Sequence, residues 1–131
     1  MRKVKMNITY ACVLLAGLTP LIAVTIAKWK LPNYDNHNPR DWMARQTGFR
    51  ARAYAAHQNC FESFPFFAVS VIMAMMVGVD AQTLDLCSLI YVVARLLYIL
   101  CYVKDWAAAR SLCWVVGYGS VIALFVLGFQ V

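Results

Sequence analysis

The sequence contains few charged residues, and acidic residues are the scarcest among them. Only 14% of its 131 residues are charged, with six aspartates and glutamates against 12 lysines and arginines. Hydrophobic residues make up 63% of the chain, and the mean hydropathy is +0.63. A soluble domain of this size has too much surface to bury so many apolar side chains. The composition therefore excludes an ordinary soluble fold and predicts a single domain that lies in a bilayer.

Long apolar runs with one charged residue or none are the main feature of this chain. A membrane-spanning helix needs about 20 mostly apolar residues to cross roughly 30 Å of hydrocarbon, and continuous runs of this kind exclude the alternating strands of a membrane barrel. Although a basic N-terminus precedes the first run, that run is long and lacks a clear cleavage site, so we expect a retained helix. We predict an all-α integral membrane protein, a four-transmembrane-helix bundle forming one domain over residues 1–131, with spans at 7–27, 60–79, 86–103 and 111–129.

The segment before the second span is polar but rich in helix-forming residues. Residues 28–40 contain two prolines and three asparagines, a composition typical of a loop. Asp41 has the short carboxylate that suits a helix N-cap, and good helix formers follow it. We therefore expect one helix from residue 41 to residue 79. Its polar first half would project beyond the membrane, and Pro65 would kink it.

Basic residues gather on one side of the predicted membrane. The other side carries Arg2, Lys3 and Lys5 only. Because positively charged loops stay in the cytoplasm, we predict that the first loop and the third turn are cytoplasmic and that both termini lie opposite. The positive charge of these residues would attract anionic headgroups or an anionic ligand at one membrane face. It does not indicate binding to nucleic acid. The residues on the basic side are Lys28, Lys30, Arg40, Arg45, Arg50, Arg52, Lys104 and Arg110.

The five cysteines show no pattern of a metal site or of a disulfide framework. Their number is odd, they are scattered among the predicted spans, and no C-x-x-C pair occurs. We interpret them as small buried hydrophobic residues and predict no metal site. Cys60 lies beside a polar cluster and is the one worth testing for reactivity.

Polar residues interrupt the beginning of the second span, in the stretch RAYAAHQNCFESFP. Arg52 and Asn59 are seven residues apart and share one helical face, and Glu62 lies about one turn beyond Asn59. Glu62 is the only acidic residue within a predicted span. His57 belongs to the same cluster, although packing is the commoner role for such a histidine. The cluster predicts a polar stripe that leads from the basic side into the membrane.

The third span carries a matching stripe. Arg95, Tyr98 and Tyr102 follow Tyr91 at helical spacing. An arginine inside a span costs several kcal/mol unless it is paired or hydrated. Because a short turn would make the two helices antiparallel neighbours, we expect Arg95 to pair with Glu62 or to share a polar cavity with it. The alternative is that these groups only hold the helices together.

Taken together, these residues resemble the MAPEG superfamily, the membrane-associated proteins in eicosanoid and glutathione metabolism, and in particular its microsomal glutathione transferase-like members. The stretches AHQNCFESFPFF and RLLYILCY carry the resemblance, which extends from the first loop to the fourth span. The resemblance implies a homotrimer of four-helix subunits that binds glutathione in a cytosol-facing cleft between subunits. The matching residues are Asn59, Glu62, Pro65, Arg95, Tyr98 and Tyr102.

The resemblance also implies roles for individual residues. Asn59, Glu62, Tyr98 and Tyr102 match glutathione-contacting positions, and Arg52 matches an arginine seven residues before the asparagine. With a one-residue shift in the turn, Arg110 matches the catalytic arginine that stabilises the thiolate. We add His57 and Arg95 to the candidate binding residues. Glutathione would be the co-substrate, the second substrate would be a lipophilic electrophile or a lipid hydroperoxide, and no metal would be needed.

Three positions depart from the family pattern. Ala55 stands where active members commonly have an arginine, Ala51 replaces a glutamate, and Ser63 replaces a tyrosine of some members. Loss of an arginine clamp would weaken the binding of a carboxylate about ten- to a hundredfold. The alternative function is therefore a non-catalytic lipid- or small-molecule-binding protein of this fold. A small proton-coupled exporter would need an acid in the first span, which has no charge.

Overall fold

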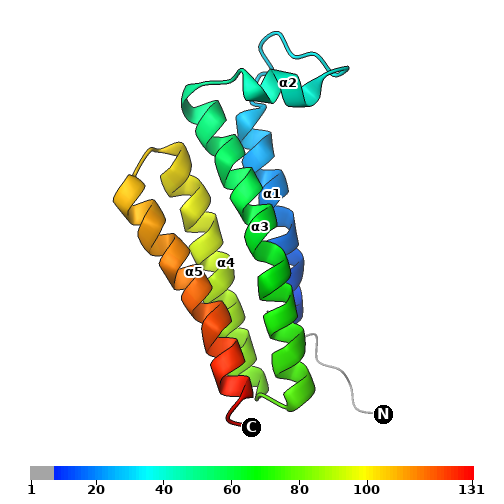
Figure 1. The fold of residues 1–131 in the computed structure, drawn as a ribbon, viewed down its shortest axis with the longest axis vertical. Coiled ribbons are helices and arrows are strands. Elements are labelled where there is room, and N and C mark those ends of the chain that lie inside the picture. Colours follow the sequence, from blue (N-terminus) through cyan, green and yellow to red (C-terminus); the bar gives the residue numbers. More distant parts are fainter. Residues whose placement is uncertain (1–7) are drawn as a thin grey trace.

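Five helices make up the part of the chain that the computed structural model describes, residues 8–131. Four long helices stand side by side, and the short α2 lies across one end of them (Figure 1). No strand occurs within residues 8–131, so the predicted all-α fold is confirmed. The helices are α1 (Ile8–Ala27), α2 (Pro39–Ala44), α3 (Gly48–Val77), α4 (Ala81–Val103) and α5 (Ala107–Gly128).

The four long helices are each long and apolar enough to cross a membrane. Their outward faces carry large exposed hydrophobic side chains, such as Leu14, Ile72, Leu86 and Ile122. In water such a surface would be unfavourable, whereas lipid tails cover it without cost. The chain is therefore a multi-pass integral membrane protein. Asn7 and the basic residues Arg2, Lys3 and Lys5 lie outside the described residues.

The helices run alternately up and down. The α3–α4 turn, the start of α1 and the C-terminus lie at one end, and α2 and the α4–α5 turn lie at the other (Figure 1). α1 packs against α3 and α4, and α5 packs against α4 and α3. We call the end formed by residues 28–47 and the α4–α5 turn the basic end. The sequence correctly predicted that these two segments lie together.

The predicted continuous helix from Asp41 is wrong. α2 begins at Pro39 after the N-cap Asn38, so Asp41 lies in the first turn of α2 and is not its cap. The chain then leaves the helical conformation, and α3 begins at Gly48 with a φ of +59°, a left-handed value that favours glycine. Helix propensity alone does not reveal such a break. From Gly48 onward, α3 continues through Pro65 to Val77 without interruption.

The turn between α3 and α4 has a defined geometry at both ends. Gly78 has a φ of +92° and ends α3, while Val79 N donates to Ala74 O at 3.0 Å. Asp80 is the N-cap of α4 and accepts from Thr83 N at 3.0 Å. Its hydrogen bonds with Thr83 lower the pKa of the Asp80 carboxyl. Helix α4 therefore starts at Ala81, earlier than predicted, with a polar first turn.

A carboxylate from α4 fixes the start of α1. Asp85 Oδ1 accepts from Thr9 N at 2.8 Å and from Thr9 Oγ1 at 2.6 Å. The first N–H groups of a helix have no partner within the helix and carry its positive end, so an acceptor from a neighbour stabilises it. This contact joins α1 to α4 at the end of the bundle opposite the basic end.

Small side chains let α1 and α3 approach closely, and α2 closes the bundle beside them. Ala23 and Ala56 are fully buried in one cluster, and Ala27 and Ala53 in the next. Small residues at helix contacts of this kind are typical of membrane bundles. Trp42 of α2 packs onto the second cluster and donates its Nε1–H to Pro32 O at 2.9 Å.

Candidate functional site

Four of the predicted site residues line one pocket near the basic end. Asn59 comes from α3, Tyr98 and Tyr102 from α4, and Arg110 from α5. The pocket has a volume of about 420 Å³, and Ser111, Trp114 and Val115 complete its lining. We call it the Arg110 pocket. Three consecutive helices thus bring these predicted residues together.

Two arginines and two tyrosines form a continuous row of contacts at this pocket. Arg110 Cζ lies 4.5 Å from the centroid of the Tyr102 ring. Tyr102 meets Tyr98 edge to face, with centroids 5.6 Å apart and ring planes at 83°. Arg95 Cζ lies 4.2 Å from the Tyr98 centroid on α4. Guanidinium groups are attracted to aromatic faces, so the tyrosines hold Arg110 at the pocket and Arg95 behind it.

The predicted direct pair between Arg95 and Glu62 does not form, because Asn59 lies between them. Arg95 is 1% exposed, and its Nη2 donates to Asn59 Oδ1 at 2.8 Å and to Cys60 Sγ at 3.2 Å. Asn59 Nδ2 in turn donates to Glu62 Oε2 at 3.4 Å. Arg95 Nε and Nη1 have no partner within residues 8–131. The side-chain amide of Asn59 thus connects the buried guanidinium of Arg95 to the exposed carboxylate of Glu62.

Arg52, a predicted ligand-binding residue, caps a helix in the structure. Its Nε and Nη2 both donate to Val103 O, at 3.3 and 3.1 Å. Arg50 acts similarly on α1, where Nη1 donates to Ala27 O at 3.1 Å and also to Trp29 O. The last carbonyls of a helix have no partner within it and carry its negative end, so arginines stabilise them. Both guanidinium groups are therefore engaged in holding the bundle together.

His57 points toward α1 and away from the Arg110 pocket. Its Nδ1 donates to Pro20 O at 2.7 Å, which requires the tautomer with hydrogen on Nδ1. The ring lies between Tyr54, stacked at 5.6 Å, and Phe61, edge-on at 5.0 Å. These are the contacts of a side chain that packs between helices, which is the commoner role for such a histidine.

Tyr91, the first residue of the stripe on α4, belongs to the core. Its hydroxyl bonds to Ser63 Oγ at 2.9 Å, and its ring stacks on Phe67 with centroids 3.9 Å apart. Ser63, at the position where some family members have a tyrosine, is 2% exposed. It therefore serves as a partner for Tyr91 inside the bundle rather than as part of the pocket.

The pocket also has three lining residues that the sequence did not predict, Ser111, Trp114 and Val115. Trp114 and Tyr118 follow Arg110 at intervals of four, so helical spacing on α5 was the available signal. Trp114 packs on Tyr118 with centroids 4.5 Å apart, and Phe66 of α3 lies 6.2 Å from Tyr118. An aromatic row thus leads from the pocket along the contact of α3 with α5.

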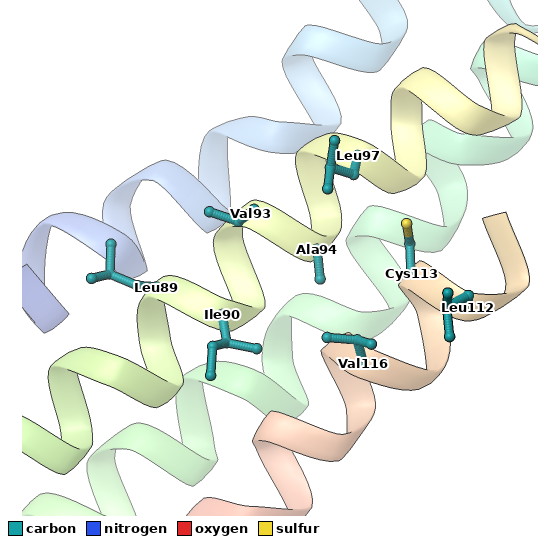
Figure 2. A pocket seen from close by; sticks show the side chains of 8 residues that line it. All are labelled: Leu89, Ile90, Val93, Ala94, Leu97, Leu112, Cys113 and Val116. Atoms are coloured by element: carbon teal, nitrogen blue, oxygen red, sulfur yellow. The ribbon is translucent and has the colours of Figure 1, made fainter. Parts of the chain in front are cut away.

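A second hollow lies between α4 and α5 and is entirely apolar in character (Figure 2). Its volume is also about 420 Å³. Apart from the Cys113 thiol its lining is aliphatic, and we assign it to contact with hydrocarbon. Figure 2 shows the side chains that line it: Leu89, Ile90, Val93, Ala94, Leu97, Leu112, Cys113 and Val116. Within residues 8–131 no group of three or more His, Cys, Asp or Glu side chains is placed to hold a metal.

Comparison with known proteins supports the resemblance seen in the sequence. The model of the MAPEG family matches residues 8–130, almost the whole chain. No curated protein matches the chain at a significant level.

Proposed function

The chain belongs to the MAPEG family, and from this premise we propose that it is a membrane-bound, glutathione transferase-like enzyme. It would conjugate glutathione to lipophilic electrophiles or use it to reduce lipid hydroperoxides. One observation carries the proposal: Arg110 lies over Tyr102 at a pocket of about 420 Å³ that Asn59 and Tyr98 also line. The pocket therefore combines a cation, hydroxyl groups and an amide near the end of a membrane-spanning bundle.

Arg110 supplies the positive charge that stabilises a thiolate. The thiolate is the reactive form of glutathione, and a free thiol has a pKa of ~8.5. A guanidinium beside the sulfur favours the ionised form at neutral pH. The thiolate then attacks the electrophilic atom of the second substrate, and the leaving group departs with the bonding electrons. In the peroxidase reaction, two glutathione molecules reduce one hydroperoxide to an alcohol and water and become a disulfide.

The second substrate reaches the pocket from the lipid side. Trp114 and Val115 form the apolar part of the lining, and the aromatic row of Trp114, Tyr118 and Phe66 continues from there toward the membrane interior. A lipophilic molecule already dissolved in the bilayer meets these side chains without crossing water. The thiol and the apolar substrate therefore approach Arg110 from different directions.

We further propose that the protein works as a homotrimer whose basic end faces the cytoplasm. Glu62 lies in a membrane-spanning helix and is exposed on the bundle, as are its neighbours Phe61 and Phe66. An acidic side chain facing hydrocarbon is costly, so this face of α3 fits best against another subunit or a water-filled cleft. Chemical cross-linking of the solubilised protein tests the trimer, and a single band at the monomer mass would contradict it.

Turnover of glutathione with chlorodinitrobenzene tests the activity. The purified protein should form the conjugate, and Arg110→Ala should reduce kcat/KM about a hundredfold, because the thiolate loses its cation. Arg45→Ala is the matched control, since Arg45 is exposed near the end of α2 and does not line the pocket. If glutathione fails to bind at millimolar concentration, the enzymatic proposal is wrong.

A second function has one specific observation in its favour. Ala55 replaces the arginine that active members commonly have, and Arg50 and Arg52 are engaged at helix ends. A site with so few free cations suits a non-catalytic protein that binds a lipid or another small molecule. Lipid that co-purifies with the protein in the absence of any glutathione turnover would support this function instead.

A further inference from the structure

A third hollow lies at the basic end, where α1 ends, and shares no lining residue with the Arg110 pocket. Its volume is about 550 Å³, and we call it the Lys28 hollow. Because α1 is a membrane-spanning helix, its end lies where the hydrocarbon gives way to lipid headgroups. We propose that this hollow binds an anionic phospholipid of the adjacent leaflet and recognises its phosphate with two lysines. The lining residues are Val24, Thr25, Lys28, Trp29, Lys30 and Leu31.

The lining places positive charge next to apolar surface, as a phospholipid requires. Val24 lies on α1 one turn before Lys28, on the membrane side of the two lysines. Trp29 and Leu31 are exposed beside them. Tryptophan is typical of the membrane–water interface, where its ring meets lipid and its N–H meets polar groups. A small anion would need the lysines alone, whereas the apolar side chains favour a ligand that also has acyl chains.

The ammonium group of Lys28 is held in place by a neighbouring aromatic pair. Lys28 Nζ donates to the Tyr34 hydroxyl at 3.3 Å and lies 5.1 Å from the centroid of its ring. Tyr34 packs edge-on against the buried Trp42, with centroids 5.2 Å apart. A lysine ammonium has three N–H donors, so the bond to Tyr34 leaves others for a ligand. Lys28 is thus oriented in advance, which lowers the cost of ordering it on binding.

The charge of the two lysines is not needed elsewhere in the loop. Arg50 stabilises the negative end of α1, where its Nη1 donates to Ala27 O at 3.1 Å. The carboxylate of Asp35 accepts from His37 N at 2.8 Å and from Asn38 Nδ2 at 3.3 Å. Asp35 is therefore engaged within its own turn. Both lysines can direct their charge to a phosphate in the hollow.

Lipid titration of the solubilised full chain, followed by native mass spectrometry, tests the inference. Dioleoyl phosphatidylglycerol and dioleoyl phosphatidylcholine carry the same acyl chains and differ in headgroup charge. The wild-type protein should bind phosphatidylglycerol at least about tenfold more tightly, because a lysine near anionic lipid contributes about fivefold. Lys28→Gln combined with Lys30→Gln should remove this preference. Equal Kd values of the two lipids for the wild-type protein would contradict the inference.

A charge-matched pair of substitutions is the control. Arg45→Gln combined with Lys104→Gln removes the same charge from the basic end, at two exposed residues outside the hollow. This variant should keep the wild-type Kd for phosphatidylglycerol within about threefold. If both double variants weaken the lipid equally, the attraction is a general effect of surface charge and the inference is wrong. Thermal unfolding shows whether the variants fold, and the comparison of two lipids on the wild-type protein does not depend on them.

Two competitors distinguish a lipid from other anions. Inorganic phosphate at millimolar concentration should leave phosphatidylglycerol bound, and its displacement would make the hollow a site for small anions instead. Glutathione should also leave the lipid bound, and displacement by glutathione would assign the two lysines to the substrate site. Either displacement overturns the inference. The inference does not rest on the proposed function, since glutathione turnover without any preference for anionic lipid would overturn it and leave the enzyme in place.

Discussion

Arg110 of α5 lies over the ring of Tyr102 of α4, with its Cζ 4.5 Å from the ring centroid. Because the two residues stand on either side of the α4–α5 turn, this contact fixes a cation of one helix on the aromatic face of the other. It places Arg110 at the pocket with its other lining residues Asn59 and Tyr98. The position of the cation therefore depends on the aromatic ring rather than on an acidic partner.

Replacing Tyr102 separates the role of its ring from that of its hydroxyl. Tyr102→Phe keeps the ring under Arg110, so the pH dependence of kcat/KM should not change, although affinity for glutathione falls. Tyr102→Leu removes the cation–π contact and should lower kcat/KM about three- to thirtyfold. It should also move the thiol-dependent rise in rate to higher pH, toward the free-thiol pKa of ~8.5. Equal pH profiles for both variants would contradict this role of the ring.

Asn59→Ala should destabilise the fold. The asparagine oxygen accepts from Arg95 Nη2 at 2.8 Å, and this guanidinium is buried. Removing an acceptor from a charged donor costs about 1.5–3 kcal/mol. Asn59→Asp retains an acceptor and adds a counter-charge, so it should unfold at a higher temperature than Asn59→Ala. Thermal unfolding in detergent measures both, and equal stability of Asn59→Ala and wild type would show that Arg95 finds another partner.

Asp85→Ala should weaken the attachment of α1. The carboxylate accepts from the backbone N–H and the hydroxyl of Thr9, and Thr9 is 2% exposed. Leaving these donors without an acceptor costs about 1–3 kcal/mol, whereas Asp85→Asn keeps one oxygen and should cost less. Asp41→Ala is the control, since Asp41 is exposed on α2. If all three variants unfold at the same temperature, this contact does not stabilise the bundle.

His57→Ala should affect stability and leave catalysis nearly unchanged. His57 donates to Pro20 O on α1 and packs between two aromatic rings, away from the Arg110 pocket. Loss of this partly buried hydrogen bond costs about 1 kcal/mol. Glutathione KM and kcat, measured at a temperature where the variant remains folded, should stay within about twofold of wild type. A large decrease in kcat would instead assign His57 a role in the reaction.

The fold could be predicted because its main determinants are local. Apolar runs that contain at most one charged residue mark the membrane-spanning helices, and short turns make successive helices antiparallel. The periodicity of α3 and α4 also brought Asn59, Tyr98 and Tyr102 to one place, since residues on facing stripes meet. These predictions required no knowledge of how helix ends pack.

What the sequence did not reveal depends on tertiary contacts at helix ends. Arg50 and Arg52 look like free cations in the sequence, but each is engaged by helix carbonyls from another part of the chain. The break before Gly48 depends on a left-handed φ that helix propensity does not report. Trp114 enters the pocket only because α5 packs beside α3.

The thiolate absorbance of bound glutathione tests the central claim most directly. Ultraviolet difference spectra at neutral pH, recorded as glutathione is added to the solubilised protein, measure how much of the bound thiol is ionised. The wild-type protein should show a saturable thiolate signal, and Arg110→Ala should lose it while Arg45→Ala retains it. Saturable binding of glutathione without a thiolate signal, or an undiminished signal in Arg110→Ala, would contradict the role of Arg110.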